Sequence, residues 1–177
     1  MISVVVFDWG GTVMRDFGQP GPMARWPEVA ATDGAADALG RIAAGHRLAL
    51  ATNAADSDSA LVREALARVG LDRFFPTIFV SSEIGAEKPA PAFFRAVING
   101  LGCAPDELVM VGDSYENDVR GGRAAGMWTI WYNPAARPPP AGARDHDAQV
   151  TALNSLPFVL HRLEMWVERA GRHMLGP

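Results

Sequence analysis

Cysteine and lysine each occur once in this chain of 177 residues, as Cys103 and Lys88. A single cysteine excludes an intrachain disulfide and a zinc site built from several thiolates. Apart from Lys88, all of the 16 basic residues are arginines. Because lysine is a compact point charge and arginine a planar fork, the two are not interchangeable at a tight site. Lys88 is therefore a candidate functional residue, the alternative being a lysine retained by chance.

The chain also lacks a basic excess and a long apolar run. Its formal net charge is −4, so we expect no basic face that would bind nucleic acid. The N-terminal run ISVVVF is short, has no positive flank and ends at Asp8, which argues against a signal peptide and a membrane span. With 49% hydrophobic residues, we expect one globular domain over residues 1–177. The expected location is cytoplasmic, with no nucleic acid and no membrane as partner.

Short apolar runs alternate with helical patterns along the chain. Near-continuous hydrophobicity predicts buried strands of a parallel sheet at residues 2–7, 47–51, 77–80, 107–111 and 127–132. Apolar residues at helical spacing predict helices at residues 34–44, 57–70, 89–102 and 117–126. This alternation predicts an α/β fold: a doubly wound, mainly parallel sheet in a three-layer α/β/α arrangement.

Two segments break the alternation. Residues 16–33 are rich in Pro and Gly and predict a loop, and residues 133–145 predict a stiff, Pro-rich surface connection. A last helix is predicted from a stripe at helical spacing, which comprises Leu156, Val159, Leu160, Leu163, Trp166, Val167 and Ala170. Core packing explains this stripe best, and a homodimer surface is the alternative.

Polar groups suited to phosphate chemistry follow four of the five predicted strands. In doubly wound sheets, ligands bind beyond the carboxyl ends of the strands, so we expect these groups to converge on one site. In chain order they are Asp8, Thr52, Asn53, Lys88, Asp113 and Asp118.

Each type of group has a physical task in phosphoryl transfer. A carboxylate can attack phosphorus and form an aspartyl-phosphate, and Asp8 is the candidate nucleophile. Clustered carboxylates repel one another and a phosphate, and a Mg²⁺ ion held by Asp8, Asp113 and Asp118 would offset both repulsions. The Thr52 hydroxyl can donate to a phosphoryl oxygen. Lys88 can neutralise charge that develops there and orient the nucleophile.

Other readings exist for each residue taken alone. Asp113 can cap a helix and Asp118 can be its first-turn acid, while the segment Thr52–Asn53 can be an ordinary turn. Together, in order and at four strand ends, these residues favour a site. Gly10 and Gly11 add to it, because residues without side chains let backbone N–H groups approach an anion closely.

Four segments of the chain resemble, in order, the four motifs of the haloacid dehalogenase-like hydrolase superfamily. They are FDWGGTV, LALATN, GAEKPAPAFF and MVGDSYENDVRGGRAAGM. The resemblance runs from the first predicted strand to about Tyr132, and the final segment is similar to that family's closing strand and helix. It implies a Rossmann-like core, and most members of the family are phosphatases.

The resemblance also implies a role for each matching position. Asp8 would be the nucleophile and a magnesium ligand. Thr52 and Lys88 would bind the transferred phosphoryl group. Asp113 would bind magnesium, and Asp118 would support the metal shell or Lys88.

Position 10, whose backbone carbonyl would bind the metal in this family, departs from the family pattern. The family's phosphatases usually have a second aspartate there, which protonates the leaving oxygen and then activates water. Gly10 has no side chain for either task, and general acid–base help is worth about a hundredfold to ten-thousandfold in rate. We therefore expect slow turnover of sugar or alkyl phosphates and better turnover of acyl or aryl phosphates.

No other titratable residue has a predicted position that would supply the missing proton. Four acids near the motifs fit solvated surface, and they are Asp16, Glu28, Asp33 and Asp56. His46 precedes the second strand and is expected at the opposite end of the sheet. His146 lies by the Pro-rich connection.

Relatives with other chemistry also lack the second acid. The dehalogenase branch works without metal and generally lacks the paired acids found here at Asp113 and Asp118. The phosphonoacetaldehyde hydrolase branch has a small residue at this position but uses a lysine from an inserted cap domain, whereas this chain contains no lysine besides Lys88. The spacing between the motifs leaves room for the 16–33 loop in place of a cap, so the cleft should be open.

The sequence thus predicts a magnesium-dependent phosphohydrolase with an open cleft, acting on a small phosphorylated molecule or a larger one. The alternative is a phosphate-binding or phospho-ligand-binding module of the same fold with negligible turnover, which Gly10 favours. The predicted site consists of Asp8 and Lys88 as catalytic residues, Gly11, Thr52, Asn53 and Lys88 as substrate-binding residues, and Asp8, the Gly10 carbonyl, Asp113 and Asp118 around Mg²⁺.

Overall fold

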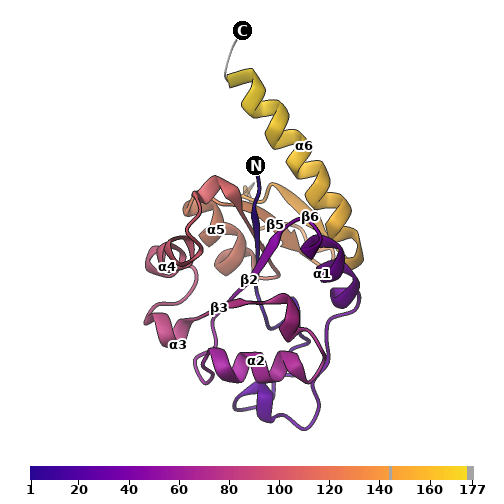
Figure 1. Cartoon of the computed structure of the whole chain (residues 1–177), viewed down its shortest axis with the longest axis vertical. Coiled ribbons are helices and arrows are strands. Elements are labelled where there is room, and N and C mark those ends of the chain that lie inside the picture. The colour runs from indigo at the N-terminus through magenta and orange to yellow at the C-terminus, as the bar shows by residue number, and fades with distance from the viewer. Residues whose placement is uncertain (144, 175–177) are drawn as a thin grey trace.

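A six-stranded, all-parallel sheet forms the centre of the molecule (Figure 1). The computed structural model describes residues 1–143 and 145–174, with side chains placed as far as residue 169. The strands are β1 (Val4–Phe7), β2 (Arg47–Thr52), β3 (Thr77–Val80), β4 (Leu108–Gly112), β5 (Trp128–Tyr132) and β6 (Ala148–Val150). They lie in the order β3-β2-β1-β4-β5-β6. The predicted doubly wound α/β fold is confirmed, and β6 is a strand that the apolar runs alone did not predict.

Helices cover both faces of the sheet, as the near-continuous apolar strands require. The α-helices are α1 (Ala35–Ala43), α2 (Ser59–Ala67), α3 (Ser81–Ile84), α4 (Pro91–Leu101), α5 (Gly121–Ala124) and α6 (Leu156–Met174). The short helices are η1 (Met23–Arg25), η2 (Asp72–Phe74), η3 (Pro105–Glu107), η5 (Leu153–Ser155) and the π-helical η4 (Tyr115–Arg120). The helix predicted over residues 117–126 is therefore two pieces, η4 followed by α5.

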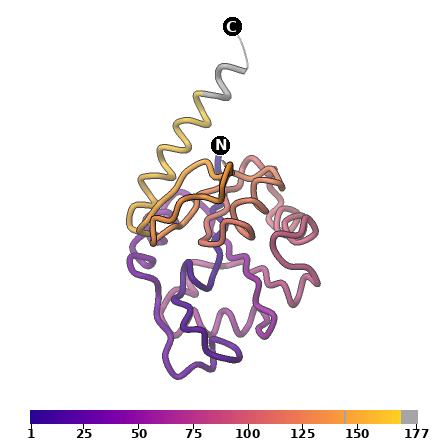
Figure 2. Tube along the Cα trace, turned by 180° about the vertical axis from the view of Figure 1, so that it is seen from behind, coloured from indigo at the N-terminus to yellow at the C-terminus, as the bar shows by residue number. Residues whose placement is uncertain are grey.

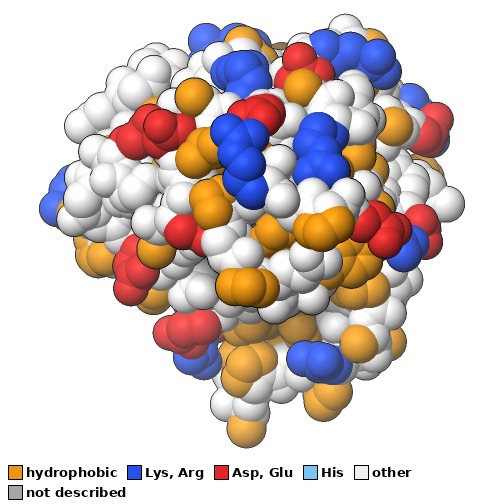
Figure 3. Space-filling view, turned by 90° about the horizontal axis from the view of Figure 1, so that it is seen from below, with side chains coloured by type: hydrophobic (Ala, Val, Ile, Leu, Met, Phe, Trp, Pro, Cys, Tyr) orange, Lys and Arg blue, Asp and Glu red, His pale blue; other side chains and the backbone are white. Residues whose placement is uncertain are grey.

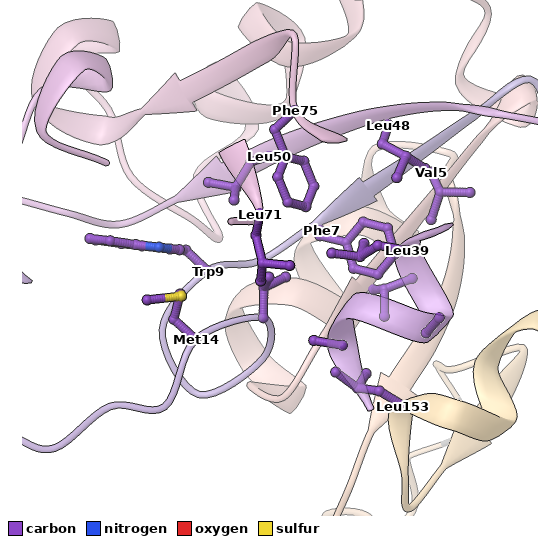
Figure 4. Close-up of a cluster of buried hydrophobic side chains, with 14 of the residues drawn as sticks. Val5, Phe7, Trp9, Met14, Leu39, Leu48, Leu50, Leu71, Phe75 and Leu153 are labelled. Atoms are coloured by element: carbon purple, nitrogen blue, oxygen red, sulfur yellow. The ribbon is translucent and has the colours of Figure 1, made fainter. Parts of the chain in front are cut away.

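Alternate residues of β1 pack into two separate hydrophobic clusters. Val5 and Phe7 pack with α1, α2 and the start of α6 in a large cluster (Figure 4). Val4 and Val6 point the other way, into a cluster with α4. This period of two is the geometry of a strand buried on both faces. Full burial of a side chain such as Phe7 stabilises the fold by roughly 1.5–3 kcal/mol, so the central strand is firmly held.

The last helix leaves the body of the protein. Leu156, Leu160 and Leu163 are buried against the sheet, which confirms the core packing predicted for the first part of the stripe. Beyond Leu163 the burial of the stripe is only partial, since Trp166 is 56% exposed while Val167 is partly buried against the main core. Figures 1 and 2 show α6 running outward past the other elements. Ala170, the last member of the predicted stripe, lies outside the described side chains.

The order of the strands fixes where a site can form. The chain proceeds outward from β1 through β2 to β3, then returns to pair β4 with the other side of β1. The carboxyl ends of β1, β2 and β4 therefore meet at a topological switch point, where doubly wound sheets bind ligands. None of the helices within the described residues has the length and hydropathy that a membrane crossing needs.

Candidate active site

Asp8 stands at the switch point because β1 ends one residue before it. Phe7 pairs with Leu50 of β2 on one side and with Val111 of β4 on the other. The Asp8 N–H donates to the Val111 carbonyl at 2.9 Å, which extends the ladder by one bond. The carboxylate is left at the mouth of the sheet, buried but for 7% of the residue.

Lys88 joins two carboxylates in the interior of the site. Its Nζ lies 2.7 Å from Asp8 Oδ1 and 2.7 Å from Asp118 Oδ1, and it donates to the Ala51 carbonyl at 2.8 Å. These three bonds use all three N–H groups of the ammonium. Lys88 is thus arranged to hold and orient the nucleophile, and a bond to a phosphoryl oxygen would have to replace one of the three.

Asn53 fixes the chain at Lys88. The Asn53 side-chain amide donates to the Lys88 carbonyl at 2.8 Å, and its oxygen accepts from the Lys88 N–H at 2.8 Å. Through this paired contact Asn53 positions Lys88 and ties the end of β2 to the segment before α4. Asn53 also lines the pocket, and its predicted contact with substrate stays a prediction.

Asp118 owes its place to a glycine. The residue is 1% exposed, and its Oδ2 accepts the Ser114 N–H at 3.0 Å. A Cβ on Gly112 would lie 2.2 Å from that same Oδ2, closer than any real contact. The glycine at the end of β4 therefore makes room for Asp118 to turn back from η4 into the site.

Thr12 is a site residue that the sequence reading did not assign. It is fully buried, and its Oγ1 lies 3.1 Å from Asp8 Oδ2 and 3.1 Å from Asp113 Oδ1. The same oxygen accepts the Asp113 N–H at 3.1 Å. Since a hydroxyl has one proton, it donates to one of the two carboxylates at a time. The available signal in the sequence was a threonine four residues after the candidate nucleophile, within the segment FDWGGTV.

Burial and neighbouring charge shift three ionisable groups of the site. Burial alone lowers the pKa of Lys88, but the charges of Asp118 and Asp8 outweigh it and the net pKa is raised. Burial raises the pKa of Asp118, and Lys88 offsets only part of this effect. Partial enclosure of the carboxyl group and then the charge of Asp8 raise the pKa of Asp113. The negative charge of the three carboxyl groups is thus only partly offset by Lys88. Such an excess of negative charge favours the binding of a cation.

The three carboxylates form the only group of acidic, histidine or cysteine ligands within the described residues that could hold a metal ion. One oxygen each of Asp8, Asp113 and Asp118 lie within 4.8 Å of one another. Asp113 is the exposed member and borders the open pocket, while the other two are buried. The Gly10 carbonyl accepts no hydrogen bond from the described residues and lies on the same pocket.

Donors for an anion remain around Asp8. The Thr52 hydroxyl borders the pocket and forms no hydrogen bond within the described part of the chain, and the N–H groups of Trp9 and Gly10 likewise have no acceptor there. The Gly11 N–H, by contrast, donates to the Met14 carbonyl at 2.8 Å. Gly11 has a φ of 83°, and a Cβ there would lie 2.8 Å from Asp113. Its contribution is the tight turn, because its amide is already engaged.

Two acids interpreted as plain surface do border the pocket. Asp16 and Asp56 are exposed residues that line it, together with the carboxylate cluster and Lys88. Glu28 and Asp33 do not line it. His46 lies at the other end of the sheet, where its Nε2 is 2.7 Å from Glu164 Oε1, as its place before β2 predicted. His146 contacts the Tyr115 hydroxyl at 3.2 Å and lines a different pocket.

The segment 16–33 is a fixed wall over part of its length. Arg68, which follows the last residue of α2, donates to three carbonyls of this segment, those of Ala24, Trp26 and Pro27, at 3.1, 2.6 and 3.1 Å. The Trp26 indole N–H donates to the Gly21 carbonyl at 2.9 Å. Three buried side chains, Met23, Ala24 and Trp26, anchor the wall in the main core.

Comparison with known proteins points to one family. A family model described as haloacid dehalogenase-like hydrolase matches residues 24–126. The matched region contains Thr52, Lys88, Asp113 and Asp118, and it begins after Asp8 and Gly10.

Curated relatives match parts of the chain. A phosphoserine phosphatase of Thermus thermophilus is 42% identical over 94 residues, which are 53% of this chain and 36% of that protein. An N-acylneuraminate-9-phosphatase of Mus musculus is 34% identical over 119 residues, 67% of this chain and 47% of that protein. The chain therefore spans less than half the length of either relative.

Solved structures share the fold over more of the chain. An uncharacterised protein of Listeria monocytogenes has a TM-score of 0.81 at 28% identity, with 93% of this chain and 99% of that chain covered. A phosphatase of Thermococcus onnurineus has a TM-score of 0.64 at 28% identity, with coverage of 75% and 59%.

Proposed function

Because the chain belongs to the haloacid dehalogenase-like hydrolase family, we propose that it hydrolyses phosphorylated substrates through a phosphoenzyme formed on Asp8. The observation that carries the proposal is the network in which Lys88 joins Asp8 to Asp118 at the carboxyl ends of the central strands. Burying Lys88 with two carboxyl groups is unfavourable unless they are paired, and shifted pKa values of this kind are typical of reactive sites. The phosphatase names of the partial relatives agree with this activity.

The residues divide the reaction into two steps. The Asp8 carboxylate attacks phosphorus, the bond from phosphorus to the leaving oxygen breaks, and the leaving group departs. Water then attacks the phosphorus of the acyl phosphate, which releases inorganic phosphate and restores the carboxylate. Lys88 and Thr12 hold Asp8 in place, and the Thr52 hydroxyl with the Trp9 and Gly10 N–H groups donate to the phosphoryl oxygens.

The donor set fits magnesium. Carboxylate and carbonyl oxygens are the hard ligands that Mg²⁺ prefers, and raised carboxyl pKa values are what an added cation would relieve. Asp8, Asp113 and the Gly10 carbonyl would hold the ion, with Asp118 supporting them. When bound, Mg²⁺ would neutralise charge on the substrate phosphate.

Gly10 limits which substrates turn over well. No side chain at this position can protonate the leaving oxygen, so esters of poor leaving groups lose general-acid help worth about a hundredfold to ten-thousandfold. We propose that acyl and aryl phosphates are better substrates than sugar phosphates. The runner-up function is a phosphate-binding or phospho-ligand-binding module with negligible turnover, and the same glycine is the observation that favours it.

We further propose a single domain with a minimal cap. In this arrangement the 16–33 segment takes the place of the cap and leaves the cleft open to a small phosphorylated molecule or a larger substrate. We also propose that the protein is cytoplasmic and has no nucleic-acid or membrane partner. A homodimer stays a prediction, which sedimentation of the purified chain would measure.

The test is phosphate release in the presence of Mg²⁺ from an acyl phosphate, para-nitrophenyl phosphate and a sugar phosphate. Asp8→Asn, which keeps the shape of the side chain, is the control. We expect release that favours the two activated substrates, requires Mg²⁺ and is absent from Asp8→Asn. Equal turnover of the sugar phosphate would show that another residue replaces the missing acid. No release above the control from any substrate would favour the binding module.

A further inference from the structure

The pocket in front of Asp8 extends well beyond a phosphate. Its volume is about 590 Å³, and apolar and further acidic residues line it beside the carboxylate cluster. The buried side chains of Trp9, Met23 and Trp26 form the apolar part. Asp16 and Asp56 stand on it as exposed acids. A leaving group attached to a phosphate at Asp8 would extend into this space.

Lys88 is the one cation among the described residues that line the pocket, and its ammonium is already bonded to neighbouring groups. Its ammonium is 2.7 Å from each of Asp8 and Asp118 and donates its third N–H to a carbonyl. No arginine lines the pocket in the described part of the chain, although arginines are frequent in the sequence. A second anionic group on a substrate would therefore meet Asp16 and Asp56 with no counter-charge.

The apolar wall is held in a fixed shape. The Arg68 guanidinium does not line the pocket and donates to the carbonyls of Ala24, Trp26 and Pro27. The Trp26 indole N–H donates to the Gly21 carbonyl. Aromatic faces attract cations, and attraction to Trp is the strongest of the aromatic residues. A preformed wall of this kind selects a ligand at low entropic cost.

From these features we propose that the substrate is a phosphate ester whose leaving group carries an ammonium group next to an apolar part. The ammonium is attracted by Asp16 and Asp56, and the apolar part packs on Trp9, Met23 and Trp26. Substrates with a carboxylate or a second phosphate in the leaving group are disfavoured by the same carboxylates. This inference rests on the proposed function for the orientation of the phosphate toward Asp8.

The test uses phosphonates, which cannot be hydrolysed because the carbon–phosphorus bond does not break in this chemistry. Three phenylphosphonates that differ in the para group (trimethylammonio, acetyl or carboxylate) are titrated into the Mg²⁺-loaded protein by calorimetry. A unit charge about 4 Å from a carboxylate in water is favoured or disfavoured by roughly fivefold, so we expect the ammonium compound to bind at least about tenfold more tightly than the carboxylate. The difference should shrink at high salt concentration.

Matched variants locate the preference. Asp16→Asn and Asp56→Asn should each reduce the ratio of the two affinities, and the double variant should bring it close to one. Glu28→Gln removes the same charge from the same segment but does not line the pocket, so it should leave the ratio unchanged. Equal affinities, tighter binding of the carboxylate, or no binding of any of the three would overturn the inference.

The two proposals fail separately. Phosphate release without a charge preference among the phosphonates would leave the phosphohydrolase standing and remove this inference. A charge preference that follows Asp16 and Asp56 in a protein that releases no phosphate would keep the inference and favour the binding module.

Discussion

A Cβ added to Gly10 would meet one neighbouring atom, Met23 Cε, at 4.0 Å. This is ordinary van der Waals contact, and Gly10 is not among the glycines with a positive φ. The position that lacks the expected acid is thus open to a side chain both in space and in backbone conformation. Gly10 differs in this respect from Gly11 and Gly112, where added atoms would collide with Asp113 and Asp118.

The first prediction follows from that space. Gly10→Asp should fold normally and accelerate release of phosphate from a sugar phosphate by about a hundredfold or more, because it supplies a general acid. Acyl phosphate, whose leaving oxygen needs little protonation, should gain far less. Gly10→Asn is the control of equal size without a titratable proton. A gain in Gly10→Asn equal to that in Gly10→Asp would contradict the role assigned to this position.

The second prediction concerns the single lysine. Lys88→Met keeps most of the side-chain volume but leaves the Asp8 and Asp118 carboxylates buried without a counter-charge. Breaking a buried ion pair in this way lowers the free energy of unfolding by about 3–5 kcal/mol. Arg41→Met removes an exposed partner of Asp37 and should change it by less than about 1 kcal/mol. Urea denaturation at neutral pH measures both, and similar losses in the two variants would show that the network is not strongly coupled.

The third prediction concerns close packing at the end of β4. Gly112→Ala places a methyl group where Asp118 Oδ2 now lies, so Asp118 must move out of contact with Lys88. We expect a loss of about 1–3 kcal/mol in unfolding free energy, together with weaker Mg²⁺ binding. Gly45 is exposed with open space around its Cβ position, so Gly45→Ala should leave Mg²⁺ binding intact. Wild-type Mg²⁺ affinity in Gly112→Ala would mean that Asp118 does not support the ion.

Much of this site could be predicted from the sequence because its residues follow buried strands. Near-continuous apolar runs locate β1, β2 and β4, and parallel pairing then brings Asp8, Thr52 and Asp113 to one edge. Strand β6 escaped the apolar-run pattern because Ala148–Val150 is short and has one buried residue.

Other features depend on the path of the chain, which local pattern does not reveal. Asp16 and Glu28 are both acids of one Pro-rich and Gly-rich segment, yet only Asp16 borders the pocket. In the sequence Arg68 resembles any surface arginine at the end of a helix, and its three carbonyl partners lie some forty residues away. The exposure of Trp166 follows from the direction of α6, since helical spacing reports a shared face and not what covers it.

The fourth prediction tests whether Arg68 fixes the part of the 16–33 segment that it contacts, residues 22–27. Arg68→Ala removes hydrogen bonds to the carbonyls of Ala24, Trp26 and Pro27, so residues 22–27 should open more often. Arg25 is exposed and lies in this segment, and trypsin should cleave after it several-fold faster in the variant. Arg63→Ala, in the helix that ends just before Arg68, removes bonds to Phe75 and Pro76 instead and should not change cleavage at Arg25. An unchanged cleavage rate in Arg68→Ala would show that the buried side chains alone fix the wall.

The distribution of charge over one face of the molecule bears on the last prediction. Figure 3 shows acidic and basic side chains interspersed among apolar ones on the face seen from below, with no large area of one sign. Local charge at the carboxylate cluster should therefore decide how Mg²⁺ binding depends on pH. Burial raises the pKa of Asp118 to about 7 and also raises that of Asp113.

The sign follows from the raised values. In the metal-free protein Asp118 keeps its proton to higher pH than in the unfolded chain, so its contribution to stability is present below about pH 4 and is lost as the pH rises toward 7. Mg²⁺ binds the ionised carboxylates, so binding expels this proton and the affinity should fall by up to about tenfold for each pH unit below 7. Mg²⁺ should accordingly raise the melting temperature more at pH 8 than at pH 5. At pH 8 the carboxylates are ionised and their repulsion lowers the stability of the metal-free protein, and the bound ion offsets this loss. Calorimetry in two buffers of different ionisation enthalpy measures the protons released near pH 6, and an affinity independent of pH with no proton release would show that the ion does not bind at this cluster.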